Sequence, residues 1–209
     1  LVGTNNLSTA IIILGIAVIL AFVSRPGYLQ FIWIGLTGIG FIALFLSMEQ
    51  YRLERLVIWK NPEVHEKGFQ TIQGLYAIGS GGLFGTGFGK GIQKLGFVPE
   101  AQNDMIFSII CEENGLIGAI LLLTLFLILL WRFMVIATHA RDRLGAFLAA
   151  GIMAHIAIQV ILNVAVVTNS IPNTGITLPF ISYGGTSSLF LLAEMGVALA
   201  VSRWQNRQA

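Results

Sequence analysis

Apolar residues fall in long blocks along this chain, and short polar segments separate the blocks. A membrane-spanning helix needs about 20 mostly apolar residues, because the hydrocarbon core is about 30 Å thick and a helix rises about 1.5 Å per residue. Five segments meet this requirement, at residues 7–23, 31–48, 115–137, 144–168 and 180–201. The pattern predicts an all-α, polytopic membrane protein forming a single transmembrane domain over residues 1–209.

Charge placement predicts how these helices cross the membrane. When the five segments alternate in direction, the arginines of the short loops fall on one side, at Arg25, Arg132, Arg141, Arg143, Arg203 and Arg207. Short loops rich in Lys and Arg face the cytoplasm, whereas long loops count little. Loop 50–112 and loop 169–179 are therefore expected to face outward.

Composition supports the membrane assignment and excludes other classes. Of 209 residues, 56% are hydrophobic and 11% are charged, against about 25% charged in soluble domains. Twelve basic and ten acidic residues leave no footprint for nucleic acid. Cys111 is the lone cysteine, and with three histidines it forms no zinc-type cluster. The chain begins without Met, and we expect it to be a piece of a longer membrane protein whose first half is absent.

Loop 50–112 is too apolar to be an unstructured tether. Residues 51–59 and 69–78 are each typical of a short helix lying at the membrane interface. Seven glycines follow within residues 79–91, but Gly89-Lys90 is followed by Gly91, so the spacing of a nucleotide-binding loop is missing. The glycines favour close packing against helices, with contact between this loop and a lipid pyrophosphate as the alternative.

Acidic residues near the end of this loop are candidates for chemistry. Asp104 precedes the apolar Met105 and Ile106, and partial desolvation there would raise its pKa and make it a better base. The alternative is a helix N-cap. Glu112 and Glu113 either hold a cation or mark the interfacial end of a helix.

Polar residues also occur in the segments that lead into or form the last predicted spans, where the surroundings should be hydrocarbon. Segment 169–188 is rich in helix breakers, and irregular backbone at membrane depth requires burial in protein or a wet cavity. It predicts an outward-facing cavity lined by Ser182, Tyr183 and Thr186, or else a helix start packed through small residues.

Intramembrane polar groups are costly unless paired. Residues 155, 159 and 163 share one helix face, so this stripe is expected to bind Glu194 or the missing half. Glu194 itself is either structural or a proton or ion relay.

Several motifs together resemble one family of membrane proteins. They lie at residues 68–70, 77–87, 98–100, 103–107, 112–115 and 172–185. In this order and spacing they resemble the SEDS family of shape, elongation, division and sporulation proteins, whose branches are FtsW, RodA and SpoVE. The sequence of residues 172–179 resembles the FtsW and SpoVE branch more than RodA.

The resemblance implies an enzyme with ten spans, of which the five here are the last. It would polymerise lipid II into peptidoglycan in division or sporulation, acting in the bacterial plasma membrane with an outward-facing site. The family's essential acid falls on Asp104, which would act as the general base. The implied substrate-binding residues are Gln70, Lys90, Lys94, Pro99, Glu100, Asn173, Thr174, Ser182, Tyr183, Gly184 and Gly185.

The implied substrates are lipid II and an undecaprenyl-linked glycan strand. The implied partners are a class B penicillin-binding protein and other divisome or elongasome membrane proteins. No cofactor is implied with certainty, although hard oxygen ligands near Asp104 suit Mg²⁺ or Mn²⁺. Two alternatives stay open: a lipid II flippase, and a scaffold for the penicillin-binding protein without catalytic activity.

Overall fold

The computed structural model describes residues 7–24, 33, 38, 40, 50–65 and 68–205. Within these ranges the regular elements are all helical, which confirms the all-α prediction. Predicted span 31–48 lies almost wholly outside them. The elements are α2 (Leu7–Ser24), α4 (Gln50–Lys60), η1 (Pro62–Val64), α5 (Phe69–Gly81), η3 (Gln93–Leu95), α6 (Ile106–Thr138), α7 (Arg143–Val167) and α8 (Gly185–Gln205).

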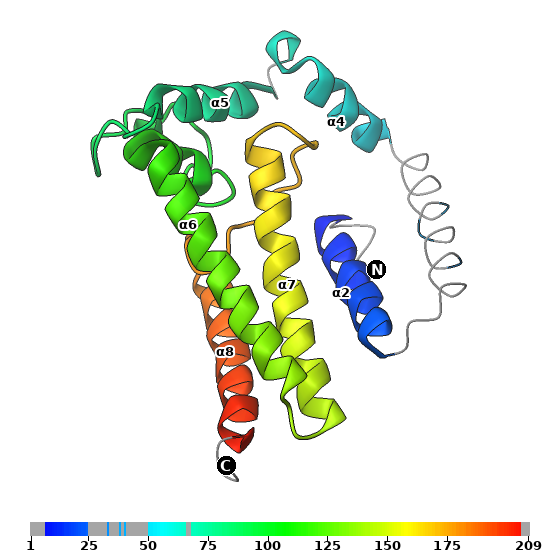
Figure 1. Cartoon of the computed structure of the whole chain (residues 1–209). Helices are drawn as coiled ribbons and strands as arrows, with labels where there is room; N and C mark the ends of the chain where they lie inside the picture. Colours follow the sequence, from blue (N-terminus) through cyan, green and yellow to red (C-terminus); the bar gives the residue numbers. More distant parts are fainter. Residues whose placement is uncertain are drawn as a thin grey trace.

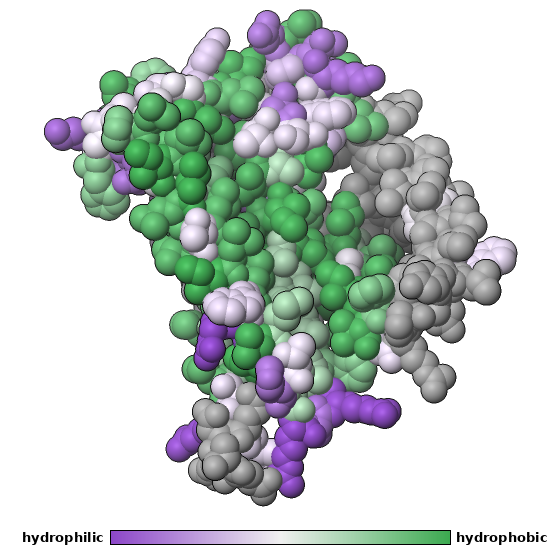
Figure 2. All heavy atoms as spheres, viewed as in Figure 1, coloured by the Kyte–Doolittle hydropathy of each residue, from purple (hydrophilic) through white to green (hydrophobic). Residues whose placement is uncertain are grey.

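Three of the described helices, α6, α7 and α8, are long and apolar enough to cross a membrane, and α2 carries a shorter apolar stretch. Large apolar side chains on their outer surfaces are exposed, with Leu127 65% and Leu192 66% accessible. Figure 2 shows a hydrophobic band across the middle of the molecule, with hydrophilic residues toward both ends. Exposing such an apolar surface to water would be unfavourable, whereas exposing it to lipid is not. The chain is a multi-pass membrane protein.

Helix α7 lies between its neighbours and contacts α2, α6 and α8 (Figure 1). Small side chains allow the close approach, since Ala149, Ala150 and Ala154 are all buried. The helix begins with a cap in which the Asp142 carboxylate accepts the backbone N–H of Gly145 at 3.2 Å. This packing makes α7 the central support for the loops at its far end.

Helix α6 starts nine residues before the predicted span and bends at Gly115, whose φ of 66° and ψ of −168° are not helical. The bend removes helical hydrogen-bond partners, and the glycine-rich loop replaces them. Leu116 N donates to the carbonyl of Gly82 at 2.9 Å, and Ile117 N donates to that of Leu83 at 3.2 Å. The bend in α6 and the loop therefore depend on each other.

Helix α8 begins at Gly185, five residues later than the predicted fifth span. Residues 171–184 contain no helix, because Pro179 has no N–H to donate and Phe180 adopts a positive φ of 64°. Ile176, Leu178 and Pro179 are nevertheless buried. Figure 1 shows this segment descending beside the bundle, so that α8 starts below the level at which α6 begins. Part of the irregular backbone is therefore buried in protein, which is one of the two predicted conditions. Of the residues predicted to line a cavity, Tyr183 and Thr186 are exposed and Ser182 is half-buried.

Candidate active site

The loops gather at one end of the bundle. Helices α4 and α5, the glycine-rich loop and the start of α6 lie at the same end of the bundle as the end of α7 (Figure 1). The opposite end carries the α6–α7 turn and the end of α8, where the Arg141 guanidinium lies 5.8 Å from the ring centre of Trp204. The acidic and amide side chains of the candidate site therefore lie at the end that carries α4 and α5, and the opposite end carries Arg141 and Trp204.

Asp104 is buried at this end, with 8% of its surface exposed. The Gln70 side chain, from α5, donates through Nε2 to both carboxylate oxygens at 3.3 Å. Burial raises the pKa of Asp104 above its ordinary value, and the negative charge of Glu100 adds to the rise. The Asp104 backbone N–H and the side chains of Gln70 and Asn173 oppose it by hydrogen bonding to the charged form. The direction is the one that the sequence predicted.

The capping alternative for Asp104 is wrong. The residue that caps α6 is Met105, and no side-chain hydrogen bond caps the helix. The Asp104 carboxylate is instead turned toward α5 through Gln70. The acid is therefore available for something other than ending a helix.

Asn163 of α7 holds the backbone of the site. Its side chain is fully buried, and Nδ2 donates to the carbonyl of Asp104 at 2.8 Å and to that of Ile176 at 2.7 Å. One amide therefore fastens two loops that are far apart in the sequence. The sequence predicted that Asn163 pairs with Glu194 or with the missing half of the protein, and the structure instead gives it these two carbonyls.

Two further hydrogen bonds join the same loops. Ser182 Oγ donates to the carbonyl of Asn103 at 2.7 Å and accepts the N–H of Leu178 at 2.7 Å. The N–H of Tyr183 donates to the carbonyl of Gln102 at 2.8 Å. The segment before α6 is thus fixed from α5, from α7 and from the segment before α8.

Glu112 and Glu113 hold the glycine-rich loop against α6. Both are buried, and Glu112 Oε1 accepts the backbone N–H of Ile92 at 2.9 Å. Glu113 Oε2 accepts the N–H of Gly89 at 2.9 Å, and its Oε1 lies 2.6 Å from the Lys94 ammonium. In the described part of the chain no group of three or more His, Cys, Asp or Glu residues could hold a metal ion. These contacts favour a structural role for both acids, one that the sequence pattern did not indicate.

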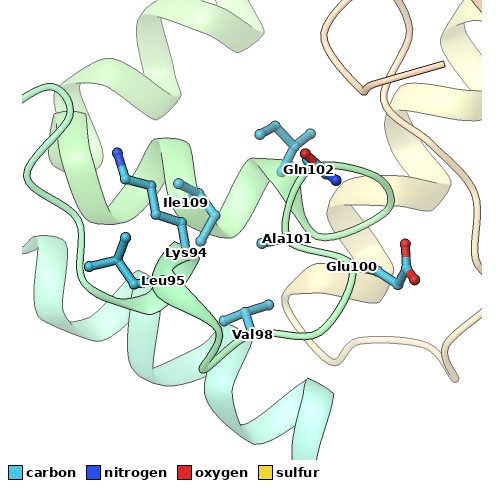
Figure 3. A pocket seen from close by; sticks show the side chains of 8 residues that line it. Lys94, Leu95, Val98, Glu100, Ala101, Gln102 and Ile109 are labelled. Carbon is cyan, nitrogen blue, oxygen red and sulfur yellow. The ribbon is translucent and has the colours of Figure 1, made fainter. Parts of the chain in front are cut away.

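A cleft of about 510 Å³ lies beside the segment that carries Asp104. In Figure 3, Lys94 and Leu95 lie on one side of it, and Glu100 and Gln102 lie on the other. Asp104 does not line it, because its carboxylate is turned toward Gln70. The full lining is Lys94, Leu95, Val98, Glu100, Ala101, Gln102, Ile106 and Ile109.

The structure brings some of the predicted site residues together and leaves others apart. Gln70 hydrogen-bonds the Asp104 carboxylate, and Ser182 hydrogen-bonds the carbonyl of the residue before Asp104. Asn173 is among the groups that lower the pKa of Asp104. The other predicted residues are less closely tied to the carboxylate. Lys90, Pro99, Tyr183 and Gly185 are exposed, and Thr174 and Gly184 are half-buried.

The intramembrane acid of α8 is paired, as the sequence predicted. The Nδ1 atom of His155 lies 2.9 Å from Glu194 Oε1 and 3.0 Å from Oε2. This contact joins α7 to α8 and gives both polar side chains a partner within the apolar bundle.

Two curated proteins are similar in sequence to most of this chain. Stage V sporulation protein E of Bacillus subtilis is 48% identical over 202 residues, which cover 95% of this chain and 55% of the relative. A probable peptidoglycan glycosyltransferase FtsW of Trichlorobacter lovleyi is 40% identical over 199 residues, covering 94% and 52%.

A solved structure described as "Structural coordination of polymerization and crosslinking by a peptidoglycan synthase complex" matches all of this chain and 59% of its own, with a TM-score of 0.79 and 26% identity. The chain spans about half the length of the curated relatives it matches. The model of the FtsW, RodA and SpoVE family, described as "Cell cycle protein", matches residues 1–207, so the chain belongs to this family.

Proposed function

We propose that the full-length protein is a peptidoglycan glycosyltransferase that polymerises lipid II, with Asp104 as its general base. The supporting observation is the buried Asp104 carboxylate, whose pKa is raised by burial and which Gln70 orients. A carboxylate with a raised pKa is a stronger base. Relatives named as probable glycosyltransferases share this part of the chain.

In the proposed reaction Asp104 removes the proton from the 4-hydroxyl of the acceptor lipid II sugar. The hydroxyl oxygen attacks the anomeric carbon of the undecaprenyl-linked glycan strand, and undecaprenyl pyrophosphate leaves with inversion. General-base catalysis contributes about 10²–10⁴-fold, so orientation of the two substrates supplies much of the remainder. The Gln70 contacts of 3.3 Å are long, and a carboxylate accepts about four hydrogen bonds, which leaves room for the incoming hydroxyl.

The departing pyrophosphate needs positive charge nearby. Lys94 is held by Glu113 at 2.6 Å, whereas Lys90 is exposed on the same loop. Lys90 is therefore the better candidate to meet the pyrophosphate. If the reaction requires Mg²⁺ or Mn²⁺, carboxylate oxygens near Asp104 would be the candidate ligands, the ion would supply a second source of positive charge, and a chelator would remove it.

The proposed orientation follows from the arginines at the other end of the bundle. Arg132, Arg141, Arg143 and Arg203 lie in or near the ends of helices away from Asp104. Such residues favour the cytoplasmic side of the plasma membrane, which puts the candidate site on the outer side. We further propose a class B penicillin-binding protein as partner, because the matching solved structure is described as a synthase complex.

The test uses the full-length protein reconstituted with purified lipid II and its partner, with gel analysis of the glycan products. Asp104→Asn should abolish polymer while the protein still folds and binds its partner. Glu63→Gln, which changes an exposed acid of the same long loop, is the matched control and should polymerise normally. Polymer at the wild-type rate from Asp104→Asn would rule out the base assignment, and lipid II transport without polymer would favour a flippase.

A further inference from the structure

The loop between α5 and α6 exposes several large apolar side chains within a short stretch. Over residues 83–97, six of them are between 51% and 87% exposed. We name this set the apolar loop face, and it consists of Leu83, Phe84, Phe88, Ile92, Leu95 and Phe97. Soluble surfaces rarely leave so many large apolar groups in water, and patches of this kind mark contacts with proteins or with membranes.

The backbone of this loop is bound to the start of α6. The N–H of Thr86 donates to the carbonyl of Glu112 at 2.9 Å, and the N–H of Gly87 donates to that of Glu113 at 3.0 Å. The approach is close, because a Cβ at Gly85 would lie 2.1 Å from the carbonyl oxygen of Glu113. The apolar side chains are therefore presented from a backbone that is fixed to the helix.

Two buried carboxylates supply further acceptors for the same backbone. Glu112 Oε1 accepts the N–H of Ile92 at 2.9 Å and that of Gln93 at 3.2 Å, and Glu113 Oε2 accepts the N–H of Gly89 at 2.9 Å. Irregular backbone enters the low-polarity part of a bilayer only when its polar groups find partners within the protein. These N–H groups do so, and the loop is thus suited to surroundings that are poor in water.

The apolar loop face continues a surface of α6 that is also apolar and exposed. Leu116 and Ile117 are each 52% exposed, and Ile120 and Leu121, one turn further along, are 55% and 61% exposed. The N–H of Ile117 donates to the carbonyl of Leu83, so the two surfaces join at this point. Figure 1 shows the loop after α5 projecting away from α7, on the far side of α6.

A basic residue interrupts the apolar loop face. Lys90 is exposed and stands between Phe88 and Ile92 in the sequence. A lysine beside an apolar surface extends its ammonium to the polar boundary, and aromatic residues combined with lysine are typical of segments that lie in the membrane interface. Protein–protein interfaces are instead depleted in Lys. The composition favours lipid as the occupant.

We propose that the apolar loop face inserts into the interface of the lipid bilayer at the end of the bundle that carries α5. Acyl chains then surround Phe84 and Phe88, and lipid phosphates lie beside the ammonium of Lys90. Lipid contact extends in this way from α6, past its bend, to the loop that leads into the segment of Asp104. This role does not depend on the proposed reaction.

Photocross-linking identifies what covers the loop. The full-length protein carrying Phe88→p-benzoylphenylalanine is reconstituted into vesicles of phosphatidylethanolamine and phosphatidylglycerol, irradiated, and analysed by mass spectrometry. Because Phe88 is 87% exposed, the replacement should leave the fold intact. Peptides that contain position 88 should carry the mass of a phospholipid.

Val64→p-benzoylphenylalanine is the matched control. Val64 is 79% exposed in the same long loop but follows the exposed acid Glu63, and it lies outside the apolar loop face. Lipid adducts should be several-fold more frequent at position 88 than at position 64. Equal frequencies would overturn the proposal, and so would a cross-link from position 88 to a peptide of this protein or of a partner.

A spin label measures the depth of the same position by a second route. Phe88→p-acetylphenylalanine accepts an oxime-linked nitroxide without any cysteine, and Val64→p-acetylphenylalanine is again the control. In the same vesicles the label at position 88 should collide more often with molecular oxygen, which concentrates in hydrocarbon, than with a water-soluble nickel chelate. The label at position 64 should show the reverse. Equal access of the nickel chelate to both positions would show that the loop lies in water and would overturn the proposal.

Discussion

Replacing Asn163 with Leu tests the link between α7 and the candidate site. Leu has a similar size but cannot donate, so the carbonyls of Asp104 and Ile176 lose the Nδ2 group that binds them at 2.8 and 2.7 Å. Both residues are buried. A buried polar group left unpaired costs about 1–3 kcal/mol, which gives about 2–6 kcal/mol for the two. Removing Asn163 Oδ1, which is buried and unpaired within the described structure, offsets part of this cost.

Activity should fall even where the variant remains folded. Asn163 fastens the backbone of Asp104 itself, and through Ile176 it also holds the segment that carries Asn173. A displacement of about 1 Å in a reacting group can lower a rate about 100-fold. We therefore expect polymerisation to fall about 100-fold at temperatures where the variant is still folded.

The assay compares thermal unfolding of full-length protein in detergent with polymerisation of lipid II. Gln159→Leu, one turn earlier on α7, is the matched control. Gln159 Oε1 is buried and has no hydrogen-bond partner in the described part of the chain, so its loss should cost less than about 1 kcal/mol. Wild-type stability and activity in Asn163→Leu would refute the reasoning, and so would an equal loss in both variants.

Three other predictions concern separate features. A Cβ at Gly81 would lie 1.9 Å from the carbonyl oxygen of Cys111, whereas one at Gly79 would meet nothing within 4 Å. Gly81→Ala should therefore lower the free energy of unfolding by about 1–3 kcal/mol, measured by thermal unfolding, and Gly79→Ala should be neutral or stabilising. Glu100→Gln removes a charge that raises the pKa of Asp104. Because the base acts when deprotonated, the acidic limb of the pH–rate profile should move to lower pH, and movement to higher pH would contradict this account. Glu194→Gln keeps an acceptor for the histidine of α7 and should retain polymerisation; loss of activity at normal expression would assign Glu194 a part in the mechanism.

Much of the fold follows from local patterns. The predicted spans 115–137 and 144–168 correspond to α6 and α7, and the predicted interfacial helices 51–59 and 69–78 correspond to α4 and α5. The pattern could not show that α6 begins before Gly115, because Glu112 and Glu113 read as the polar end of a helix. Their partners are backbone N–H groups about 20 residues earlier in the chain, and no periodicity reveals such contacts.

The acidic residue of the candidate site could be predicted from the sequence, but the residues that hold it in place could be predicted much less well. A carboxylate next to an apolar run indicates desolvation, and this was sufficient for the rise in the pKa of Asp104. Asn163 within an apolar helix indicated a need for a partner. Which partner it finds depends on how α7 packs against two loops 59 and 13 residues away, which is a property of the folded chain.

The bend at Gly115 sets how far Asp104 lies from the long apolar part of α6. At about 1.5 Å per residue, the part of α6 after the bend is about 36 Å long, enough to cross a hydrocarbon layer of about 30 Å. The part before it, from Ile106 to Asn114, adds at most about 13 Å. If α6 crosses the membrane with its later part, the proposed base would stand at the level of the lipid headgroups. The proposed function then implies a sugar that is joined to its lipid through a pyrophosphate spacer, because a sugar attached directly to an acyl chain would lie too low to meet the carboxylate.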